Sequence, residues 1–221
     1  TIVAESLDFI SEHLEKASAK DFNDVLLKVV RDIVAKHRRI IFNGNGYSAD
    51  WEAEAIRRGL PNLKTTPDAL KPLLAPANQK LMEKYGVFSK VEMDSRYEVF
   101  LEEYHRKLRI EGEIALEIAT SMILPIAASY YGRLSADLAS AAQGKLKAGT
   151  AGLRRLADQV GAGIDRLDAA SDALRKAIAA HNPRKTLAAM TGLREVVDAL
   201  ELLVDDACWP LPKYREMLFI Y

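Results

Sequence analysis

The chain has 221 residues, of which 49% are hydrophobic and 28% are charged. This length allows one large domain or two small ones, with enough apolar side chains for a core. Lys and Arg total 31, as do Asp and Glu, so the formal net charge is zero and nucleic-acid binding is disfavoured. The single cysteine, Cys208, excludes an internal disulfide and fits a reducing cytoplasm.

The N-terminal residues lack the features of a targeting signal. Glu5 and Asp8 come early and no cationic segment precedes an apolar run, so we expect a cytoplasmic protein. The chain begins at Thr1 and enters an amphipathic pattern at once, which suggests a piece of a longer protein; a processed terminus is the alternative. The most apolar run, residues 114–128, contains a glutamate, two hydroxyl residues and a proline, and we expect it to be too short to cross a membrane.

Two amphipathic helices are predicted over residues 2–17 and 22–37, because apolar side chains recur there with helical spacing. Asp21 is the expected N-cap of the second helix, since its carboxylate can accept a free backbone N–H. The residues expected on the buried side of that helix are Phe22, Leu26, Val29, Val30 and Ile33.

Three short helices are predicted next, each delimited by its own start and stop residues. Ser48 is the expected N-cap of a helix over residues 49–58, which Gly59 ends. Thr66 is the expected N-cap of the next helix, and a third is expected over residues 77–85.

A single long helix is predicted from Ser89 to about residue 147. Apolar residues recur along it at steps of three, four or seven, and Ser89 with Glu92 forms a capping box at its start. In a helix interior Pro125 would delete one hydrogen bond and clash with the preceding turn, at a cost of about 3 kcal/mol. We therefore expect a kink at Pro125, with a complete break as the alternative.

Beyond Gly144, two further helices carry seven-residue repeats of apolar residues. In the first of them, large residues form one row and small residues form the adjacent row, a pattern that lets a neighbouring helix approach closely. We predict an antiparallel hairpin that joins the distal half of the long helix. The expected rows are Leu153, Val160, Leu167 and Leu174; Leu156, Gly163, Ala170 and Ala177; Met190, Val197 and Val204; Leu193, Leu200 and Ala207; and Leu134, Leu138, Ala142 and Leu146.

The sequence therefore predicts an all-α fold. It is a helical bundle built on one long, kinked helix, with a distal antiparallel three-helix coiled coil. We expect residues 1–130 to form a helical region with short irregular connections, and residues 131–208 to form the coiled-coil hairpin. The tail, residues 209–221, is apolar enough to dock back on the first region.

No catalytic or metal-binding motif stands out in the chain. The four histidines are scattered, and HExxH, CxxC, Gly-x-Ser-x-Gly and phosphate-loop patterns do not occur. Glu98, Glu102 and Glu103 are more typical of a salt-bridged exposed face than of an acid–base pair. Cys208 is expected to be a buried structural thiol. We assign no catalytic, cofactor-binding or metal-binding residue.

Residues 43–47 form the one stretch with unusual local chemistry. Its two Asn-Gly steps favour positive φ and tight turns, so a structural turn is the favoured interpretation. The alternative is a ligand-binding loop whose backbone amides receive an anion. The arginine pairs at 38–39 and 57–58 are interpreted as solvated faces. The residues of the candidate loop are Asn43, Gly44, Asn45, Gly46 and Tyr47.

Several short motifs follow one another along the chain. They are residues 39–48 with Trp51; residues 58–63; residues 65–70; residues 95–98 with Leu101, Glu102 and Tyr104; residues 123–125; and Trp209-Pro210-Leu211-Pro212 with Tyr214 and residues 218–219. Together, in this order, they resemble the C-terminal part of type III glutamine synthetases. Residues 1–7 resemble the stretch just after that family's catalytic core, so the resemblance covers essentially the whole chain.

The resemblance implies a parent enzyme that makes glutamine from glutamate, ammonia and ATP through γ-glutamyl phosphate, with magnesium or manganese. The family's metal-binding and phosphate-binding residues belong to the region upstream of Thr1, so none is carried over to this chain. The implied partners are the chain's own upstream catalytic domain and further copies in a large homo-oligomer. We expect a non-catalytic domain with a structural or assembly role; a protein-interaction module and a regulatory ligand-binding module are the alternatives.

Overall fold

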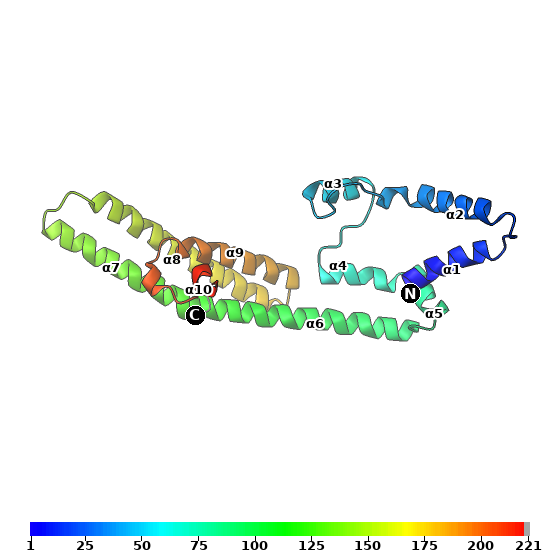
Figure 1. Ribbon diagram of the computed structural model, residues 1–221. Coiled ribbons are helices and arrows are strands. Elements are labelled where there is room, and N and C mark those ends of the chain that lie inside the picture. The colour runs from blue at the N-terminus through cyan, green and yellow to red at the C-terminus, as the bar shows by residue number, and fades with distance from the viewer. Residues whose placement is uncertain (219–221) are drawn as a thin grey trace. The chain divides into compact units, whose positions relative to one another are not determined.

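The structure is a computed structural model that describes residues 1–218 (Figure 1). Every regular element within those residues is a helix, which confirms the all-α fold class. The chain forms two compact units, a first unit of Thr1–Tyr104 and a second unit of His105–Tyr221. The further division expected at residue 130, and the docking of the tail on a first region, stay predictions about the complete protein.

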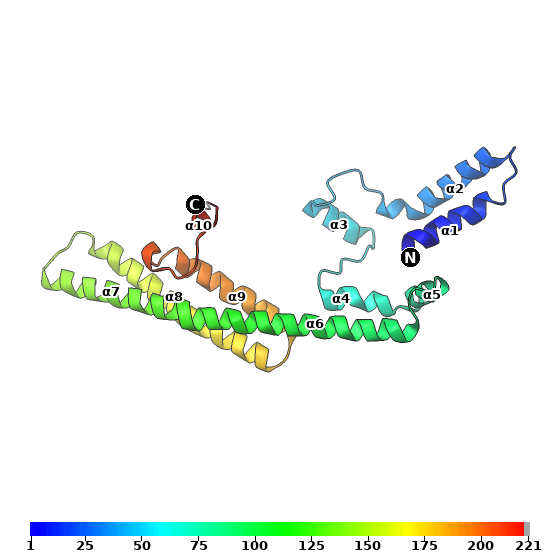
Figure 2. The same ribbon diagram turned by 60° about the horizontal axis from the view of Figure 1, so that its bottom comes forward.

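The first unit consists mainly of short helices. They are α1 (Ile2–Leu14), α2 (Phe22–His37), η1 (Arg38–Ile40), α3 (Ala49–Arg57), α4 (Thr66–Leu70), η2 (Lys71–Leu74), α5 (Pro76–Lys84) and the first part of α6 (Lys90–Glu117). The helices α1 and α2 lie side by side as an antiparallel pair in both ribbon views (Figures 1 and 2). Two turns use glycine in the left-handed region, Gly59 at φ 70° after α3 and Gly86 at φ 60° after α5.

Side-chain caps fix the starts of two helices as the sequence predicted. The Ser48 hydroxyl accepts the N–H of Trp51 at 3.4 Å and begins α3. At the start of α6, the N–H of Ser89 donates to the Glu92 carboxylate over 2.8 Å, and the N–H of Glu92 donates to the Ser89 hydroxyl over 3.3 Å. The Ser48 cap and the Ser89–Glu92 capping box satisfy backbone donors that the first helical turn leaves free.

Two expected caps were wrong in detail. The N-cap of α4 is Thr65 rather than Thr66, because the Thr65 hydroxyl accepts the N–H of Asp68. Asp21 occupies the N-cap position of α2 but accepts no backbone N–H there. Its carboxylate instead accepts a hydrogen bond from the Ser18 hydroxyl at 2.7 Å. This side-chain contact within the preceding turn replaces the expected cap.

The first unit buries very little apolar surface. Its buried apolar residues are Val29 and Met93, whereas Phe22 and Val30, both expected in the interior, are exposed. The apolar side chains of α1 and α2 are largely uncovered in this chain. The exposed large apolar residues of these two helices are Ile2, Val3, Leu7, Phe9, Phe22, Leu27, Val30 and Val34.

Polar contacts join α1 to the end of α5 instead. Lys84 Nζ lies 2.8 Å from Glu5 Oε2 and 3.3 Å from Asp8 Oδ2, and the Tyr85 hydroxyl contacts the same two carboxylates at 2.6 and 2.8 Å. Hydrogen bonds from Lys84 and then Tyr85 lower the pKa of Glu5, and those from Tyr85 and then Lys84 lower the pKa of Asp8. The bond to Glu5 is the main cause that raises the pKa of Tyr85 to about 12.

The second unit is built on long helices. The chain continues from α6 through a π-helical turn, η3 (Ile118–Ile123), into α7 (Leu124–Gln143). The remaining elements are α8 (Thr150–Ala179), α9 (Pro183–Glu201), η4 (Asp206–Cys208) and α10 (Tyr214–Met217). Both views show α8 alongside α7 and α9 alongside α8, as expected for a helical hairpin on the long helix (Figures 1 and 2).

Pro125 does not break the long helix. Residues Lys90–Gln143 form 54 consecutive helical residues, which excludes the complete break that was the alternative. The helix widens instead into the π turn directly before the proline, a common site of adjustment when a normal hydrogen bond is lost. The hydroxyls of Thr120 and Ser121, in the π turn, donate to the carbonyls of Leu116 and Glu117 at the end of α6, at 2.8 and 2.6 Å.

By length and composition alone, the helix Lys90–Gln143 is able to cross a membrane, with a mean hydropathy of 1.4 in its most apolar window. The expectation concerned residues 114–128 alone, and the helix that contains them is longer than that run. The same stretch supplies Ala119, Ile123 and Ala127, which are buried in the core of the second unit. Packing in that core accounts for part of the apolar composition.

The seven-residue repeat of α8 lies in the core, as predicted. Val160, Leu167 and Leu174 are completely buried. In the row of small residues, a Cβ on Gly163 would lie 2.5 Å from Leu200 Cδ2, which is closer than a real contact allows. A glycine is therefore needed where α9 packs on α8. Whether these helices supercoil stays a prediction.

The long-helix row reaches the core only in part. Leu134 is buried with Ala157 and Val160, and Leu138 packs against them. Ala142 and Leu146 are exposed, because α7 ends at Gln143, earlier than the predicted residue 147.

The tail after α9 packs within the second unit as far as it is described. Trp209 is buried in the same core as Ile123 and Leu200. Cys208 is only partly buried, which corrects the expected buried thiol, and its sulfur accepts Arg133 Nη2 at 2.8 Å. The final apolar residues of the expected tail, 219–221, lie outside the described residues.

Candidate functional site

The loop predicted as a candidate site is a compact, internally bonded turn. Asn45 Oδ1 accepts the N–H of Tyr47 at 3.0 Å, and the Asn45 carbonyl accepts the Ser48 hydroxyl at 2.8 Å. Neither Gly44 nor Gly46 has positive φ, so the expected reason for these glycines was wrong. Gly44 is needed for packing instead, because a Cβ there would lie 2.7 Å from the Phe42 ring.

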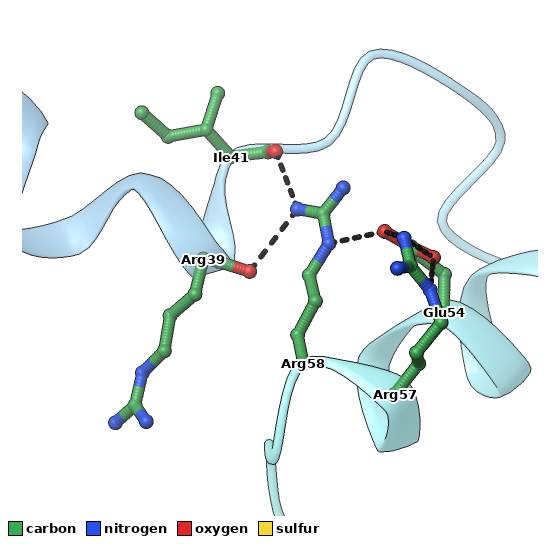
Figure 3. A network of polar contacts seen from close by, with 5 residues as sticks. All are labelled: Arg39, Ile41, Glu54, Arg57 and Arg58. Carbon is green, nitrogen blue, oxygen red and sulfur yellow. Dashed lines mark hydrogen bonds and ion pairs between the residues drawn. The ribbon is translucent and has the colours of Figure 1, made fainter.

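The sequence before the loop is tied to α3 by aromatic and arginine contacts. Phe42 stacks on Trp51 with ring centroids 4.5 Å apart. Arg58 Nη1 donates to the carbonyls of Arg39 at 3.1 Å and Ile41 at 2.8 Å (Figure 3). Its guanidinium also lies 5.6 Å from the Trp51 ring centroid. These contacts give a structural role to several residues of the motif at 39–51.

An open groove of about 1150 Å³ lies where α2, η1 and α3 meet, all within the first unit. Leu27, Val30 and Val34 provide an apolar side, spaced at i, i+3 and i+7 along α2. The loop contributes Asn43, the only one of its five predicted residues that lines the groove among the described residues. The arginines that line it are Arg31, Arg38, Arg39, Arg57 and Arg58.

The groove concentrates positive charge in a chain whose formal net charge is zero. Five arginines against one glutamate, Glu54, leave an excess of four positive charges among the lining residues. Arg57 and Arg58 both contact Glu54, and their hydrogen bonds, chiefly those of Arg57, lower the pKa of its carboxyl group. Glu54 therefore stays ionised and holds two of the five guanidinium groups in place.

The other three arginines of the groove have no such partner. Within residues 1–218, the side chains of Arg31, Arg38 and Arg39 make no ion pair with a carboxylate. Figure 3 shows the Arg39 side chain extending away from the contacts around Glu54. Arg38, Arg39 and Arg57 are exposed, as expected of solvated residues, but the structure brings both arginine pairs to one groove.

A smaller cavity of about 540 Å³ lies between α1 and α2. Its lining includes Phe9 and His13, whose ring centroids are 4.3 Å apart, and His37. Glu5, at one end, is already bonded to Lys84 and the Tyr85 hydroxyl. Its other lining residues are both polar and apolar, among them Asp32, Lys36 and Ile33.

The donor groups of residues 1–218 do not form a metal-ligand set. Across the described part of the chain, no three His, Cys, Asp or Glu side chains come together as a ligand set. The one carboxylate of the arginine groove, Glu54, is bonded to two guanidinium groups. Neither the groove nor the loop at 43–47 offers the ligands that magnesium and manganese require.

Sequence reasoning missed the groove because its arginines come from segments about twenty residues apart. One signal was present in the spacing along α2. Arg31 and Arg38 are seven residues apart, on the same side as Leu27 and Val34. Arg58 donates to the carbonyls of Arg39 and Ile41 and so ties the end of α3 to the groove. No short-range sequence pattern predicts these bonds.

The described residues form an all-helical protein of two compact units. A sequence profile described as the glutamine synthetase C-terminal domain matches residues 25–142. The chain belongs to this glutamine synthetase C-terminal domain family, in agreement with the resemblance seen in its motifs.

Three longer relatives are similar to the chain. The type-3 glutamine synthetase of Dictyostelium discoideum is 32% identical over 238 aligned positions, which cover 100% of this chain and 32% of that protein. Glutamine synthetases of Butyrivibrio fibrisolvens and Bacteroides fragilis are 29% and 27% identical, over 95% of this chain and 32% and 31% of theirs. The chain thus spans about a third of the length of the curated relatives it matches.

Proposed function

We propose that this chain is the structural C-terminal domain of a cytoplasmic glutamine synthetase. The parent enzyme ligates ammonia to glutamate through γ-glutamyl phosphate, using ATP and magnesium or manganese bound by its upstream part. The names of the three relatives support this activity, and the family membership supports the position of the domain. The chain alone is expected to be inactive, because its described residues offer no ligand set for the metal ions.

The observation that carries a structural role is the contrast in burial between the units. The second unit has its own core around Leu167 and Leu174, whereas the first unit leaves the apolar residues of α1 and α2 exposed. Burying an apolar side chain contributes about 1.5–3 kcal/mol, so uncovered residues such as Val3 and Leu7 favour a partner surface. In the proposed arrangement the first unit packs on the upstream catalytic domain and the helical hairpin supports assembly.

Deletion of residues 135–207 from the full-length enzyme tests this role. We expect a change in oligomer size by light scattering together with a loss of glutamine formation. The substitution Leu202→Ala is the control, because Leu202 directly follows α9 and is 87% exposed. Unchanged assembly and activity after the deletion would contradict the proposal.

In a second assay, the isolated chain supplied with glutamate, ammonia, ATP and magnesium should form no glutamine.

The alternative is a helical interaction module that binds a second copy of the chain. The exposed apolar residues of α1 and α2 favour this reading. Light scattering of the isolated chain over a wide concentration range separates the two proposals. A monomer at all concentrations contradicts self-association, whereas a concentration-dependent dimer supports it.

A further inference from the structure

The arginine groove combines two kinds of binding surface on one side of α2. Leu27, Val30 and Val34 are 62%, 49% and 48% exposed, and their spacing places them in one apolar row. Arg31 on α2 and Arg38, the first residue of η1, line the groove together with this row. An occupant that satisfies both features carries apolar side chains next to negative charges.

The positive charge of the groove is available to such an occupant. Arg57 and Arg58 are engaged by Glu54, but Arg31, Arg38 and Arg39 form no ion pair within the described residues. A guanidinium group presents several N–H donors in a fixed plane and matches a carboxylate with two parallel hydrogen bonds. Three such groups around an apolar row are suited to several carboxylates spread over a surface.

The geometry disfavours a compact phosphate. The groove includes the C-terminal turns of α2 and α3, through Val34 and Arg57, where free carbonyls rather than N–H groups are found. Arg58 already bonds the carbonyls of Arg39 and Ile41. The volume of about 1150 Å³ also exceeds the range of about 300–1,000 Å³ usual for small-molecule sites.

We propose that the groove receives an acidic surface, bearing apolar side chains, on the upstream part of the parent chain. This inference rests on the proposed function, because it names how the first unit meets that part. The matched relatives are about three times as long as this chain, so an upstream partner is present in each of them. The groove lies in the unit that has few buried residues of its own, and that unit gains most from such contact.

Photo-crosslinking in the full-length protein tests the proposal. p-Benzoylphenylalanine replaces Val30 in the groove of one variant, and replaces Val3, exposed on α1 and not part of the groove lining, in another. Mass spectrometry then identifies the crosslinked peptides. We expect Val30 to crosslink to an upstream segment rich in Asp and Glu. Crosslinks from Val3 alone would overturn this inference and leave the proposed function standing, whereas no upstream crosslink from either position would overturn both.

Charge variants test the role of the arginines. The double substitution Arg38→Gln, Arg39→Gln should lower the Val30 crosslink yield about three- to tenfold at 0.15 M salt. The control pair, Arg154→Gln and Arg155→Gln, also neutralises two adjacent exposed arginines, but on α8, and should leave the yield unchanged. Equal yields from both pairs would overturn an electrostatic contact.

Inorganic triphosphate tests the rival small-anion site. The groove would be such a site if the isolated chain binds triphosphate, the Arg38→Gln, Arg39→Gln pair abolishes that binding, and Val30 gives no crosslink.

Discussion

The two units use similar helices and bury them very differently. Among the described residues, sixteen apolar side chains are buried, and only Val29 and Met93 belong to the first unit. In the second unit, α8 packs against both α7 and α9, and the rows containing Leu167, Leu200 and Leu134 are buried between these helices. The first unit has amphipathic helices of the same kind, but its short segments give α1 and α2 few partners. The apolar pattern of a helix predicts which side of it can be buried. Whether that side is buried depends on the presence of a neighbouring helix or domain that covers it.

The largest effect is expected in the core of the second unit. Leu167 is completely buried in α8, so Leu167→Ala should lower the free energy of unfolding by about 2–5 kcal/mol. Urea denaturation of the chain, followed by circular dichroism, measures this change. Leu202→Ala, at an 87% exposed position, should cost less than about 0.5 kcal/mol. Similar losses at both positions would mean that the second unit lacks the tight core described above.

Gly163→Ala should have the next largest effect. The added methyl group would lie 2.5 Å from Leu200 Cδ2, and overpacking of this kind costs about 1–3 kcal/mol. Gly192→Ala in α9 is the matched control, because a Cβ there meets nothing within 4 Å. It should stabilise the helix by up to about 1 kcal/mol. The same denaturation measurement compares the two, and stabilisation by both substitutions would show that α8 and α9 are not in close contact.

In the first unit, Arg58→Lys should loosen the segment before α3. A lysine ammonium cannot reproduce the planar set of bonds from Arg58 to Arg39, Ile41 and Glu54. Hydrogen exchange of the amides at residues 41–51 should become about tenfold faster, whereas the amides of α8 should be unaffected. Arg57→Lys serves as the control, because Arg57 is more exposed and, within residues 1–218, its side chain bonds only Glu54. Equal protection in all variants would remove the structural role of Arg58.

Lowering the pH should destabilise α1 in the first unit before it destabilises α8 in the second unit. The pKa values of Glu5 and Asp8 are lowered in the folded chain, so their contribution to stability is complete above their ordinary pKa values. That contribution is lost as the pH falls below about 4, through the lowered values. Amide exchange in α1 should therefore accelerate in this range before exchange in α8 does. Tyr85→Phe, which removes one donor to both carboxylates, should weaken the pH dependence.

The smallest effect is expected at the arginine groove in the isolated chain. Leu27→Ala removes an exposed side chain and should change the free energy of unfolding by less than about 0.5 kcal/mol. In the full-length enzyme the same substitution should lower the melting temperature more than Leu187→Ala does, since Leu187 is an exposed leucine of α9 outside the groove. An equal response of both variants in the full-length enzyme would indicate that the groove is uncovered there too.

The sequence predicted the second unit better than the first for a physical reason. The rows containing Leu167 and Leu200 pair two long helices joined by a short turn, so local spacing determines the contact. In the first unit, the exposure of Val30 depends on which surface covers α2, and no local pattern contains that information. The groove depends on Arg58 reaching carbonyls 17 and 19 residues away, which is a tertiary contact without a short-range signal.

The π turn at Ile118–Ile123 also sets the rotational phase of the long helix. It holds one residue more than an α-helical turn, so every side chain after it is rotated by about 100° relative to an uninterrupted helix. With that extra residue, Ala127 and Leu134 are buried in the second unit. Removing one residue from this turn would restore regular spacing but direct those two side chains away from their partners. The π turn therefore determines which side chains of α7 face the core.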